Sequence, residues 1–248
     1  MIVVAMTLPK AILLDLDDTI ISAYSQPGLA WQAVSEEFSA EIAPLAPHEL
    51  AQAVTLSADE YWSDPTLHKA RRLDMSGSRR SIVSTALERL MAAGRPGLAD
   101  DVACRLADRF TAFREERMHL FEGAMETLVI LHKAGVKLAL VTNGAATFQR
   151  AKIERFGLAP YFDHIQIEGE HGFGKPEDAA YHHALQALNV AASDAWMVGD
   201  NLEWEVAAPQ RLGLFAIWHD HLGEGLPQGS NIVPDRIIRR LPELLEPA

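Results

Sequence analysis

The sequence predicts an α/β protein that carries an inserted helical domain. Most of the chain alternates between short apolar runs and helical segments, which is typical of a parallel sheet covered by helices. Residues 21–121 differ, because they contain helical patterns and no convincing strand. We therefore expect an α/β core formed by residues 1–20 and 122–248, and an all-helical domain formed by residues 21–121.

Five apolar runs are predicted to form the strands of the sheet. Each is rich in residues that favour strands, and turn-forming residues flank them. The runs are AILLDL (11–16), VKLALVT (136–142), HIQIE (164–168), AWMVGD (195–200) and LFAIW (214–218). In an open α/β sheet, ligands bind beyond the carboxyl ends of the strands, so polar residues that follow these runs are candidates for a site.

Helices are expected between the later strands and throughout the inserted block. Those between the strands are predicted near 123–134, 146–156, 177–188 and 203–211. Those in the block are predicted over 28–42, 47–62, 78–93 and 99–119. The breaks between them come at prolines and glycines, namely Pro44, Pro47, Asp64-Pro65 and 94–97.

The composition excludes several classes of protein. The one cysteine, Cys104, excludes a disulfide framework and a Cys-rich zinc site, and we expect it to be a small core residue. The start, MIVVAMTLPK, lacks the basic region of a signal peptide, so we expect a cytoplasmic protein. No run approaches the roughly 18 apolar residues of a membrane span. The formal charge of −12 argues against non-specific nucleic-acid binding. We expect neither a membrane nor a nucleic acid as partner; the sequence does not reveal the oligomeric state.

Three carboxylates follow the first apolar run, in the stretch AILLDLDDTI. Asp15 and Asp17 would share one face of an extended strand, and Asp18 would point the other way. Two such carboxylates repel each other unless one holds a proton or a cation lies beside them, and Mg²⁺ prefers hard oxygen ligands. One carboxylate can also act as a nucleophile and its neighbour as a general acid and base. The structural alternative is an acidic turn that caps the next helix.

Two later segments carry groups that suit a phosphate. VTNG (141–144) ends the second run and places the Thr142 hydroxyl and the backbone at Asn143 near the same edge of the sheet. FGKPED (173–178) places Lys175 in a loop before a helix, where its ammonium can hold a phosphoryl group beside a carboxylate. Taken singly, the first is an ordinary strand-to-turn signal and the second an ordinary surface lysine.

A last segment, VGDNLEWEV (198–206), carries further acidic groups. Asp200 ends the fourth run, and Asn201 and Glu205 follow it. These residues can complete a metal site, although Asp and Glu are also favoured at an ordinary helix N-terminus.

Together these motifs resemble the haloacid dehalogenase-like hydrolase superfamily. The matching residues are DLDDT (15–19), Thr142 in VTNG, Lys175 in GKP and GDNLEWE (199–205). The resemblance covers about residues 10–20 and 122–220. It implies a Rossmann-like parallel core, and the helical block resembles that family's cap, of the type inserted after the first strand.

The resemblance implies a role for each matching residue. Asp15 would be the nucleophile that forms an aspartyl-phosphate, and Asp17 would protonate the leaving group and then activate water. Thr142, Asn143 and Lys175 would hold the phosphoryl group.

The resemblance also implies a Mg²⁺ site. Asp15, the backbone carbonyl of Asp17 and Asp200 would bind the ion, with support from Asn201 and Glu205. The family more often has Asp at the position of Glu205, so contact between this longer side chain and the metal is left open.

We therefore expect a Mg²⁺-dependent phosphatase that hydrolyses a small phosphorylated metabolite. Dehalogenases resembling this fold lack an aspartate at the position of Asp17, and a phosphonate hydrolase needs a reactive cap lysine, for which Lys69 is the one candidate. A mutase of the same superfamily and a catalytically inactive binding or regulatory module remain alternatives. A dinucleotide-dependent oxidoreductase ranks lower, because no Gly-rich turn follows the first strand.

Basic residues cluster in the helical block, at Lys69, Arg71, Arg72, Arg79 and Arg80. A solvated helix face is the ordinary interpretation, and Arg71 is kept as a candidate substrate contact. Several histidines, including His171, His182 and His183, have spacings that match no zinc motif. We expect them to lie on the surface or to pack within the protein.

Overall fold

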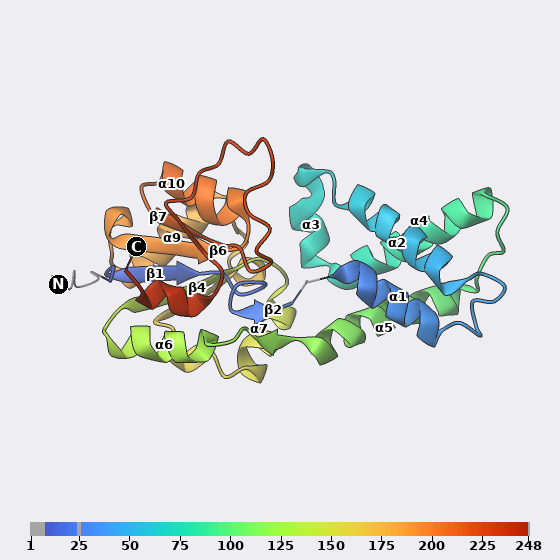
Figure 1. Ribbon diagram of the computed structural model, residues 1–248, viewed down its shortest axis with the longest axis horizontal. Coiled ribbons are helices and arrows are strands. Elements are labelled where there is room, and N and C mark those ends of the chain that lie inside the picture. Colours follow the sequence, from blue (N-terminus) through green and yellow to red (C-terminus); the bar gives the residue numbers. More distant parts are fainter. Residues whose placement is uncertain (1–7, 24–25, 248) are drawn as a thin grey trace. The chain divides into compact units, whose positions relative to one another are not determined.

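The computed structural model describes residues 8–23 and 26–247. The chain divides into two compact units (Figure 1). One, which we call the sheet unit, comprises the described residues up to Ser22 and from His119 onward. The other, the helical unit, is Ala23–Met118.

The sheet unit is built on six strands in the order β5-β4-β1-β6-β7-β8. The strands are β1 (Ala11–Leu14), β4 (Lys137–Thr142), β5 (His164–Ile167), β6 (Ala195–Gly199), β7 (Phe215–His219) and β8 (Arg236–Ile238). All neighbours in this sheet are parallel, which confirms the predicted α/β class. From β1 the chain builds outward on one side through β4 and β5, and then on the other through β6, β7 and β8. The strand order therefore reverses at β1, where such sheets bind ligands.

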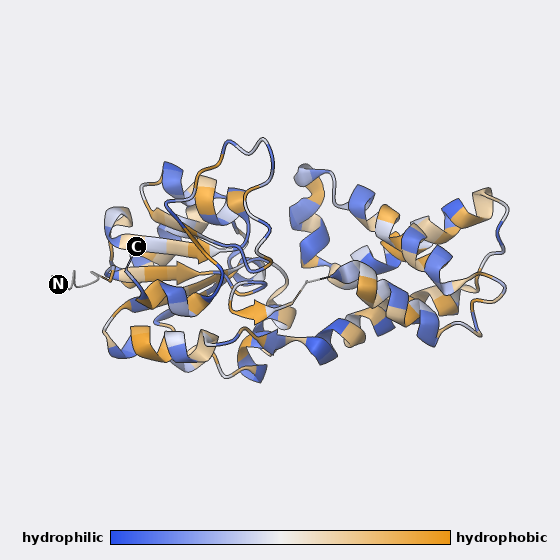
Figure 2. Cartoon of the chain, in the orientation of Figure 1, coloured by the Kyte–Doolittle hydropathy of each residue, from blue (hydrophilic) through white to orange (hydrophobic). Residues whose placement is uncertain are grey.

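Helices surround this sheet and bury its apolar residues. They are α6 (Ala124–Lys133), α7 (Ala146–Arg155), α8 (Glu168–His171), α9 (Asp178–Leu188) and α10 (Ala208–Arg211), with a π-helix, η4 (Leu202–Ala207), and short 3₁₀ turns η2 (Ala159–Tyr161), η3 (Ala192–Asp194) and η5 (Leu241–Leu245). Figure 2 shows the apolar character of the strands and the mixed character of the helices. The α9 side chains Tyr181, Ala184 and Leu188 belong to one core cluster with Leu13 and Met197 of the strands. An amphipathic helix thus covers a fully apolar sheet face.

A short antiparallel ribbon lies in the sheet unit where the predicted helical block begins and ends. Its strands are β2 (Ile21–Ser22) and β3 (His119–Leu120), and they pair Ile21 with Leu120. The prediction that residues 21–121 contain no strand is therefore wrong at both ends. Strands of two residues are too short to produce an alternating pattern in the sequence.

The helical unit has a core of its own. Its elements are α1 (Pro27–Glu37), α2 (Pro47–Tyr61), the 3₁₀ turn η1 (Pro65–Leu67), α3 (His68–Leu73), α4 (Met75–Ala92) and α5 (Asp100–Arg117). Trp31 of α1 stacks on Phe110 of α5, with ring centroids 3.8 Å apart. Asp74 caps α4 by accepting a hydrogen bond from the Gly77 N–H at 2.9 Å. The expectation that Cys104 is a core residue is wrong, because this residue of α5 is exposed.

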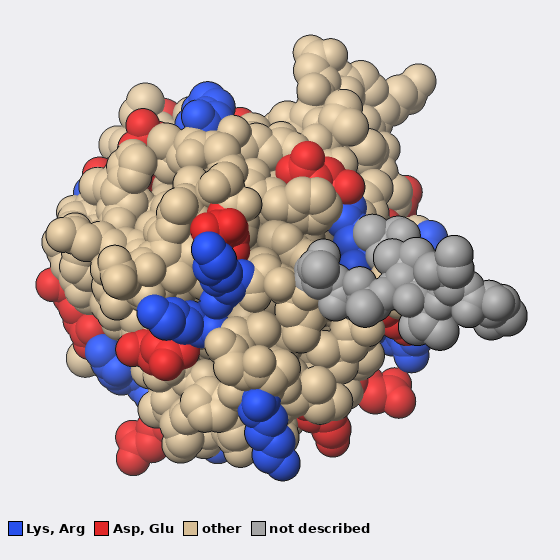
Figure 3. Space-filling model, turned by 90° about the vertical axis from the view of Figure 1, so that its left-hand side faces the viewer, with Lys and Arg blue, Asp and Glu red and all other residues tan. Residues whose placement is uncertain are grey.

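The surface carries both signs of charge. On the face drawn in Figure 3, acidic and basic side chains are interspersed and do not gather into one patch. Among the described residues, no helix combines the length and the apolar composition that crossing a membrane requires.

Candidate active site

The register of the sheet brings three strand ends together at β1. Leu14 lies opposite Leu140 of β4 and Val198 of β6. One residue later, the Asp15 N–H still donates to the Val198 carbonyl, at 3.0 Å. Asp15 therefore begins the loop after β1 at the edge where β4 ends with Thr142 and β6 is followed by Asp200.

Lys175 lies at the centre of the acidic residues at this edge. Its ammonium contacts the Asp15 carboxylate and, at 2.7 Å, Glu205 Oε1. The side chain is 1% exposed, so the alternative of a surface lysine is excluded. Burial acts to lower the pKa of Lys175, but the charges of Asp15 and Glu205 outweigh it and raise the pKa. The ammonium is thus a fixed positive charge beside the proposed nucleophile.

The loop that carries Lys175 is fastened to the end of β4. The Asn143 side chain donates to the Lys175 carbonyl at 2.7 Å and accepts from the Lys175 N–H at 2.9 Å. Glu168, which is buried, accepts from the Gly144 N–H at 3.0 Å. A Cβ on Gly174 would lie 2.6 Å from Asn143 Oδ1, so this close approach requires glycine. The Asn143 side chain therefore positions Lys175, and a phosphate contact at this residue would use its backbone.

Glu205 reaches the cluster from the π-helix η4. Besides its contact with Lys175, it accepts from the Asn201 N–H at 2.8 Å. The Asn201 side chain accepts from the N–H groups of Glu203 and Trp204, both at 3.0 Å, and so caps this helix. A Cβ on Gly199 would lie 2.1 Å from Glu205 Cγ, so the end of β6 has room for Glu205 only because residue 199 lacks a side chain.

The Asp200 carboxyl group has no direct cationic partner among the described residues. Within 8–23 and 26–247, its carboxylate has no hydrogen-bond or ion-pair partner. Burial raises the pKa of Asp200 to about 9, and the charges of Glu205 and Asp15 add to the effect. Burial also raises the pKa of Asp15 and raises that of Glu205 to about 7 against the opposing influence of Lys175. The raised pKa values mean that these groups ionise together only with a cation beside them, and their hard oxygens fit a Mg²⁺ ion.

Asp17 is held by helix α7. Lys152 Nζ lies 2.7 Å and 2.8 Å from the two carboxylate oxygens, and Gln149 Nε2 donates to one of them at 3.0 Å. The same Gln149 nitrogen donates to the Thr142 hydroxyl. Gln149 thus links two of the predicted site residues, one from the loop after β1 and one from the end of β4.

A family comparison agrees with the motifs that end these strands. A model of the haloacid dehalogenase-like hydrolases matches residues 9–213 of the 248 in the chain. The chain belongs to the haloacid dehalogenase-like hydrolase family.

Curated relatives of this hydrolase are named as phosphatases. A phosphoserine phosphatase of Thermus thermophilus is 34% identical, in an alignment that covers 95% of this chain and 97% of the relative. A ribulose-1,5-bisphosphate 5-phosphatase of Halopiger xanaduensis is 33% identical, over 85% of this chain and 84% of the relative. A glyceraldehyde 3-phosphate phosphatase of Pyrococcus furiosus is 29% identical, in an alignment that covers 96% of this chain and 92% of the relative.

Solved structures of the family share the fold of this hydrolase. YfnB of Bacillus subtilis, named as a HAD-hydrolase bound to magnesium with interdomain movement, has a TM-score of 0.68 at 25% identity and covers 97% of this chain and 100% of its own. A 2-haloacid dehalogenase of Pseudomonas syringae has a TM-score of 0.60 at 28% identity, and the match covers 96% of this chain and 97% of the dehalogenase.

Arg71 of the hydrolase makes its contacts with another residue of the helical unit, Tyr61. Its guanidinium donates to the Tyr61 carbonyl and lies over the Tyr61 ring, 4.0 Å from the centroid. Nearby, Arg79 donates to the Thr111 hydroxyl at 2.7 Å, and Arg80 pairs with Asp108 at 3.0 Å. These contacts connect the helices of that unit, and a substrate contact by Arg71 stays a prediction.

Gln149, Lys152 and Glu168 of the hydrolase were not identified from the sequence. Gln149 and Lys152 are three residues apart on the helix after VTNG and so share a face. That spacing is common on helices, and only the fold shows that this face meets Asp17. Glu168 ends a predicted strand, a position that carries no sign of its contact with residue 144.

Proposed function

We propose that this hydrolase is a Mg²⁺-dependent phosphatase that cleaves a small phosphorylated metabolite through an aspartyl-phosphate on Asp15. The family and the relatives named as phosphatases make the chain a phosphoric monoester hydrolase acting on small phosphorylated substrates. The metal, the intermediate and the role of each residue are our proposal.

One observation carries the proposal. The Asp15 carboxylate lies at the carboxyl edge of the sheet in contact with the buried Lys175 ammonium, and Glu205 balances that ammonium from the other side. A nucleophilic oxygen beside a fixed positive charge is what phosphoryl transfer requires, because its catalysis rests on positioning and charge stabilisation.

In the first half of the reaction, an Asp15 oxygen attacks the phosphorus and the bond from phosphorus to the leaving oxygen breaks. Asp17 gives its proton to that oxygen, which leaves as an alcohol. Lys175 balances the negative charge of the phosphoryl oxygens and orients Asp15. In the structure the Asp17 carboxylate is paired with Lys152, so it has to turn from that ammonium and take up a proton from solvent before it can serve as the acid.

In the second half, Asp17 takes a proton from a water molecule, whose oxygen attacks the phosphorus of the aspartyl-phosphate. The bond between Asp15 and phosphorus breaks, which releases phosphate and restores the carboxylate. The Thr142 hydroxyl and the backbone at Asn143 hold the phosphoryl oxygens through both steps. Gln149 keeps Thr142 and Asp17 at a fixed separation.

Asp15, the Asp17 carbonyl and Asp200 would hold the Mg²⁺ ion, which supplies positive charge to the transferring group. We predicted Glu205 as a further metal residue. Its oxygens accept from Lys175 and from the Asn201 N–H, so we now assign it to positioning Lys175.

We also propose that the helical unit is a cap that selects the substrate and excludes water. It interrupts the core after the first strand and carries its own core cluster, so it can act as a separate body. Interdomain movement is named for the B. subtilis relative, and a comparable movement here would open and close the site. Arg71 is our candidate for a substrate contact from this unit.

The decisive experiment is a phosphate-release assay on phosphorylated metabolites, including phosphoserine and glyceraldehyde 3-phosphate, with Mg²⁺ and after chelation. We expect activity that requires Mg²⁺ and that falls at least about 10³-fold in Asp15→Asn. Asp194→Asn is the matched control, because this exposed carboxylate pairs with Lys10.

Other outcomes distinguish the alternatives. An isomerised sugar phosphate without free phosphate identifies a mutase, and metabolite binding without turnover identifies a binding module. Halide release from a 2-haloacid would identify a dehalogenase; the aspartate at position 17 argues against it, because a halide leaves without a proton. Asp15→Asn with the activity of the wild type would overturn the proposed nucleophile.

A further inference from the structure

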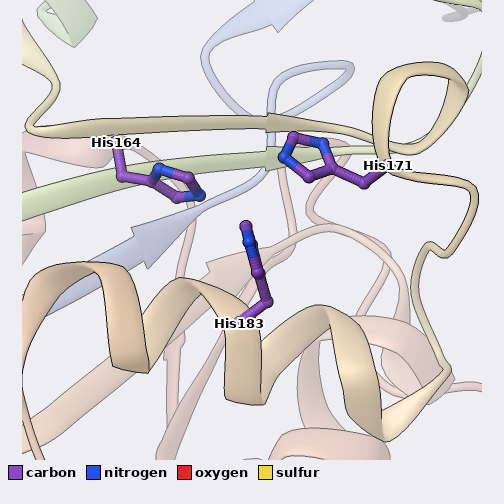
Figure 4. Close-up of side chains that lie close together, drawn as sticks. All are labelled: His164, His171 and His183. Atoms are coloured by element: carbon purple, nitrogen blue, oxygen red, sulfur yellow. The ribbon is translucent and has the colours of Figure 1, made fainter.

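Three histidines from separate elements converge on one face of the sheet unit. They are His164 on β5, His171 on α8 and His183 on α9, and one ring nitrogen of each lies within 4.8 Å of the others. Figure 4 shows the three rings turned toward a common space between the strand and the helix. The ring centroids of His171 and His183 are 4.8 Å apart, and those of His164 and His183 are 5.2 Å apart.

Hydrogen bonds orient two of these rings. The His171 Nδ1 lies 3.1 Å from the Ile167 carbonyl, and the His183 Nδ1 lies 2.8 Å from Gln166 Oε1. Because both partners are oxygens that accept, each Nδ1 is the donor, and in the neutral ring this tautomer leaves the lone pair on Nε2. Gln166 is itself fixed, since its nitrogen donates to the Ala180 carbonyl at 2.9 Å. Ligating histidines in metal sites are held in this way by their other ring nitrogen.

The third ring presents a nitrogen that lacks a partner. His164 Nε2 is buried and has no hydrogen-bond partner among the described residues. A buried polar atom left without a partner costs about 1–3 kcal/mol. Burial, together with the neighbouring His183 and His171, lowers the pKa of His164 and so favours the neutral imidazole, which is the form that binds metals.

We propose that His164, His171 and His183 form a binding site for a late first-row transition-metal dication, with Zn²⁺ as the principal candidate. Neutral imidazole nitrogens suit Zn²⁺, Ni²⁺ and Cu²⁺, whereas Mg²⁺ prefers oxygen ligands. This site is chemically distinct from the carboxylates at the end of β1. With metal–nitrogen distances of about 2.0–2.1 Å, tetrahedral coordination places ligand nitrogens roughly 3.3 Å apart, so the three rings, whose nitrogens lie within 4.8 Å of one another, would close on the ion.

The site would fasten the segment that leads to Lys175. His171 lies four residues before Lys175 in the sequence, between β5 and α9. A bound ion joins this segment to β5 through His164 and to α9 through His183. Because such a site exists only in the folded chain, the ion stabilises the fold by mass action.

Zinc binding by the full-length chain tests the proposal. We would measure Zn²⁺ by equilibrium dialysis in excess Mg²⁺, which occupies the oxygen ligands of the other site. We expect one Zn²⁺ per chain in the wild type, a raised thermal midpoint, and affinity at least about 30-fold weaker in His171→Ala and in His183→Ala. His182→Ala is the matched control, because His182 neighbours His183 on α9 but is exposed.

A spectrum of the wild type provides evidence that does not depend on the folding of a variant. Co²⁺ bound by three imidazoles with tetrahedral geometry absorbs strongly in the visible range, whereas six oxygen ligands give weak absorption. We expect the strong bands, and their loss on addition of Zn²⁺. Wild-type protein that binds no Zn²⁺ in excess Mg²⁺, or folded His171→Ala and His183→Ala that bind it as the wild type does, would overturn the proposal.

Discussion

Lys175 is the buried cation around which the acidic residues are arranged. It lies between Asp15 and Glu205 with almost no exposure to solvent. Lys175→Met keeps a side chain of similar length and removes the charge, which leaves two carboxylates without their partner. Breaking a buried ion pair in this way costs about 3–5 kcal/mol. We expect that loss in the free energy of unfolding, measured with urea in the absence of added metal.

A second lysine provides the comparison for this variant. Lys10 pairs with Asp194 at 2.8 Å, but the two side chains are 71% and 39% exposed. Such a pair contributes about 0–1 kcal/mol, so Lys10→Met should change stability little. Equal losses in the two variants would show that Lys175 is not held as a buried charge.

His219 makes stability depend on pH. The ring is buried against Phe121, and its Nδ1 lies 3.1 Å from the Asp18 carbonyl. Burial, with a contribution from His221, lowers the pKa of His219 from its ordinary value of 6.5 to about 4. Between these values the unfolded chain binds more protons, so the stabilisation is complete above pH 6.5 and is lost as the pH falls toward 4. The full effect is about 3 kcal/mol.

His219→Gln tests this linkage. The variant cannot titrate, so the stability difference between wild type and variant should shrink as the pH falls from 7 to 4. Urea denaturation across that range measures it, with exposed His182→Gln as control. A difference that stays constant with pH would exclude a neutral, buried His219.

Sequence reasoning can place at the edge of the sheet those residues whose position follows directly from their strand. Asp15 was predicted because it follows the apolar residues AILL, and Asp200 because it ends another apolar run. Gln149 and Lys152 were not, because their importance depends on a contact with Asp17, more than a hundred positions away. The clustering of the three histidines was not predicted for the same reason. They lie on three separate elements, and no regular sequence spacing relates them.

At the scale of elements, α7 supports the loops after both β1 and β4. Gln149 is buried and bonds with Asp17 and with Thr142. On the proposed mechanism, Gln149→Ala should lower kcat by about 10- to 100-fold with a smaller change in KM, because the acid and the phosphate contact lose their alignment. Steady-state kinetics measure both values.

The adjacent residue supplies the control for α7. Arg150 is about half exposed and pairs with Glu170 at 2.7 Å, so Arg150→Ala should leave kcat within about twofold. An unchanged kcat in folded Gln149→Ala would remove α7 from the proposed mechanism.

Long apolar runs predicted their strands well, whereas short elements were not predicted. β4 (Lys137–Thr142) lies within the predicted 136–142. β8 (Arg236–Ile238) was missed, because three residues that include an arginine carry little pattern. The predicted helix 203–211 exists as a π-helix followed by a short α-helix, a distinction that the apolar periodicity does not encode.

At the scale of the whole molecule, the two units have separate cores. Leu106 is 1% exposed within the helical unit. Leu106→Ala should cost about 2–5 kcal/mol, since it leaves a cavity. If the units unfold separately, amide hydrogen exchange should accelerate within Ala23–Met118 and stay unchanged in β1 and β4.

The exposed Leu56 of α2 is the control for this variant, because Leu56→Ala removes no buried contact. Exchange that accelerates equally in β1 and in the helical unit of Leu106→Ala would mean that the two units unfold together.

The position of β1 has a consequence for synthesis of the chain. This strand is synthesised before its neighbours in the finished sheet, β4 and β6, which are more than a hundred residues further along the chain. The apolar segment AILL must therefore wait, unpaired, while the whole helical unit is translated and begins to fold. During that interval it is an unpaired apolar strand that can aggregate or bind chaperones. This exposure ends when β6 has been synthesised and pairs with it.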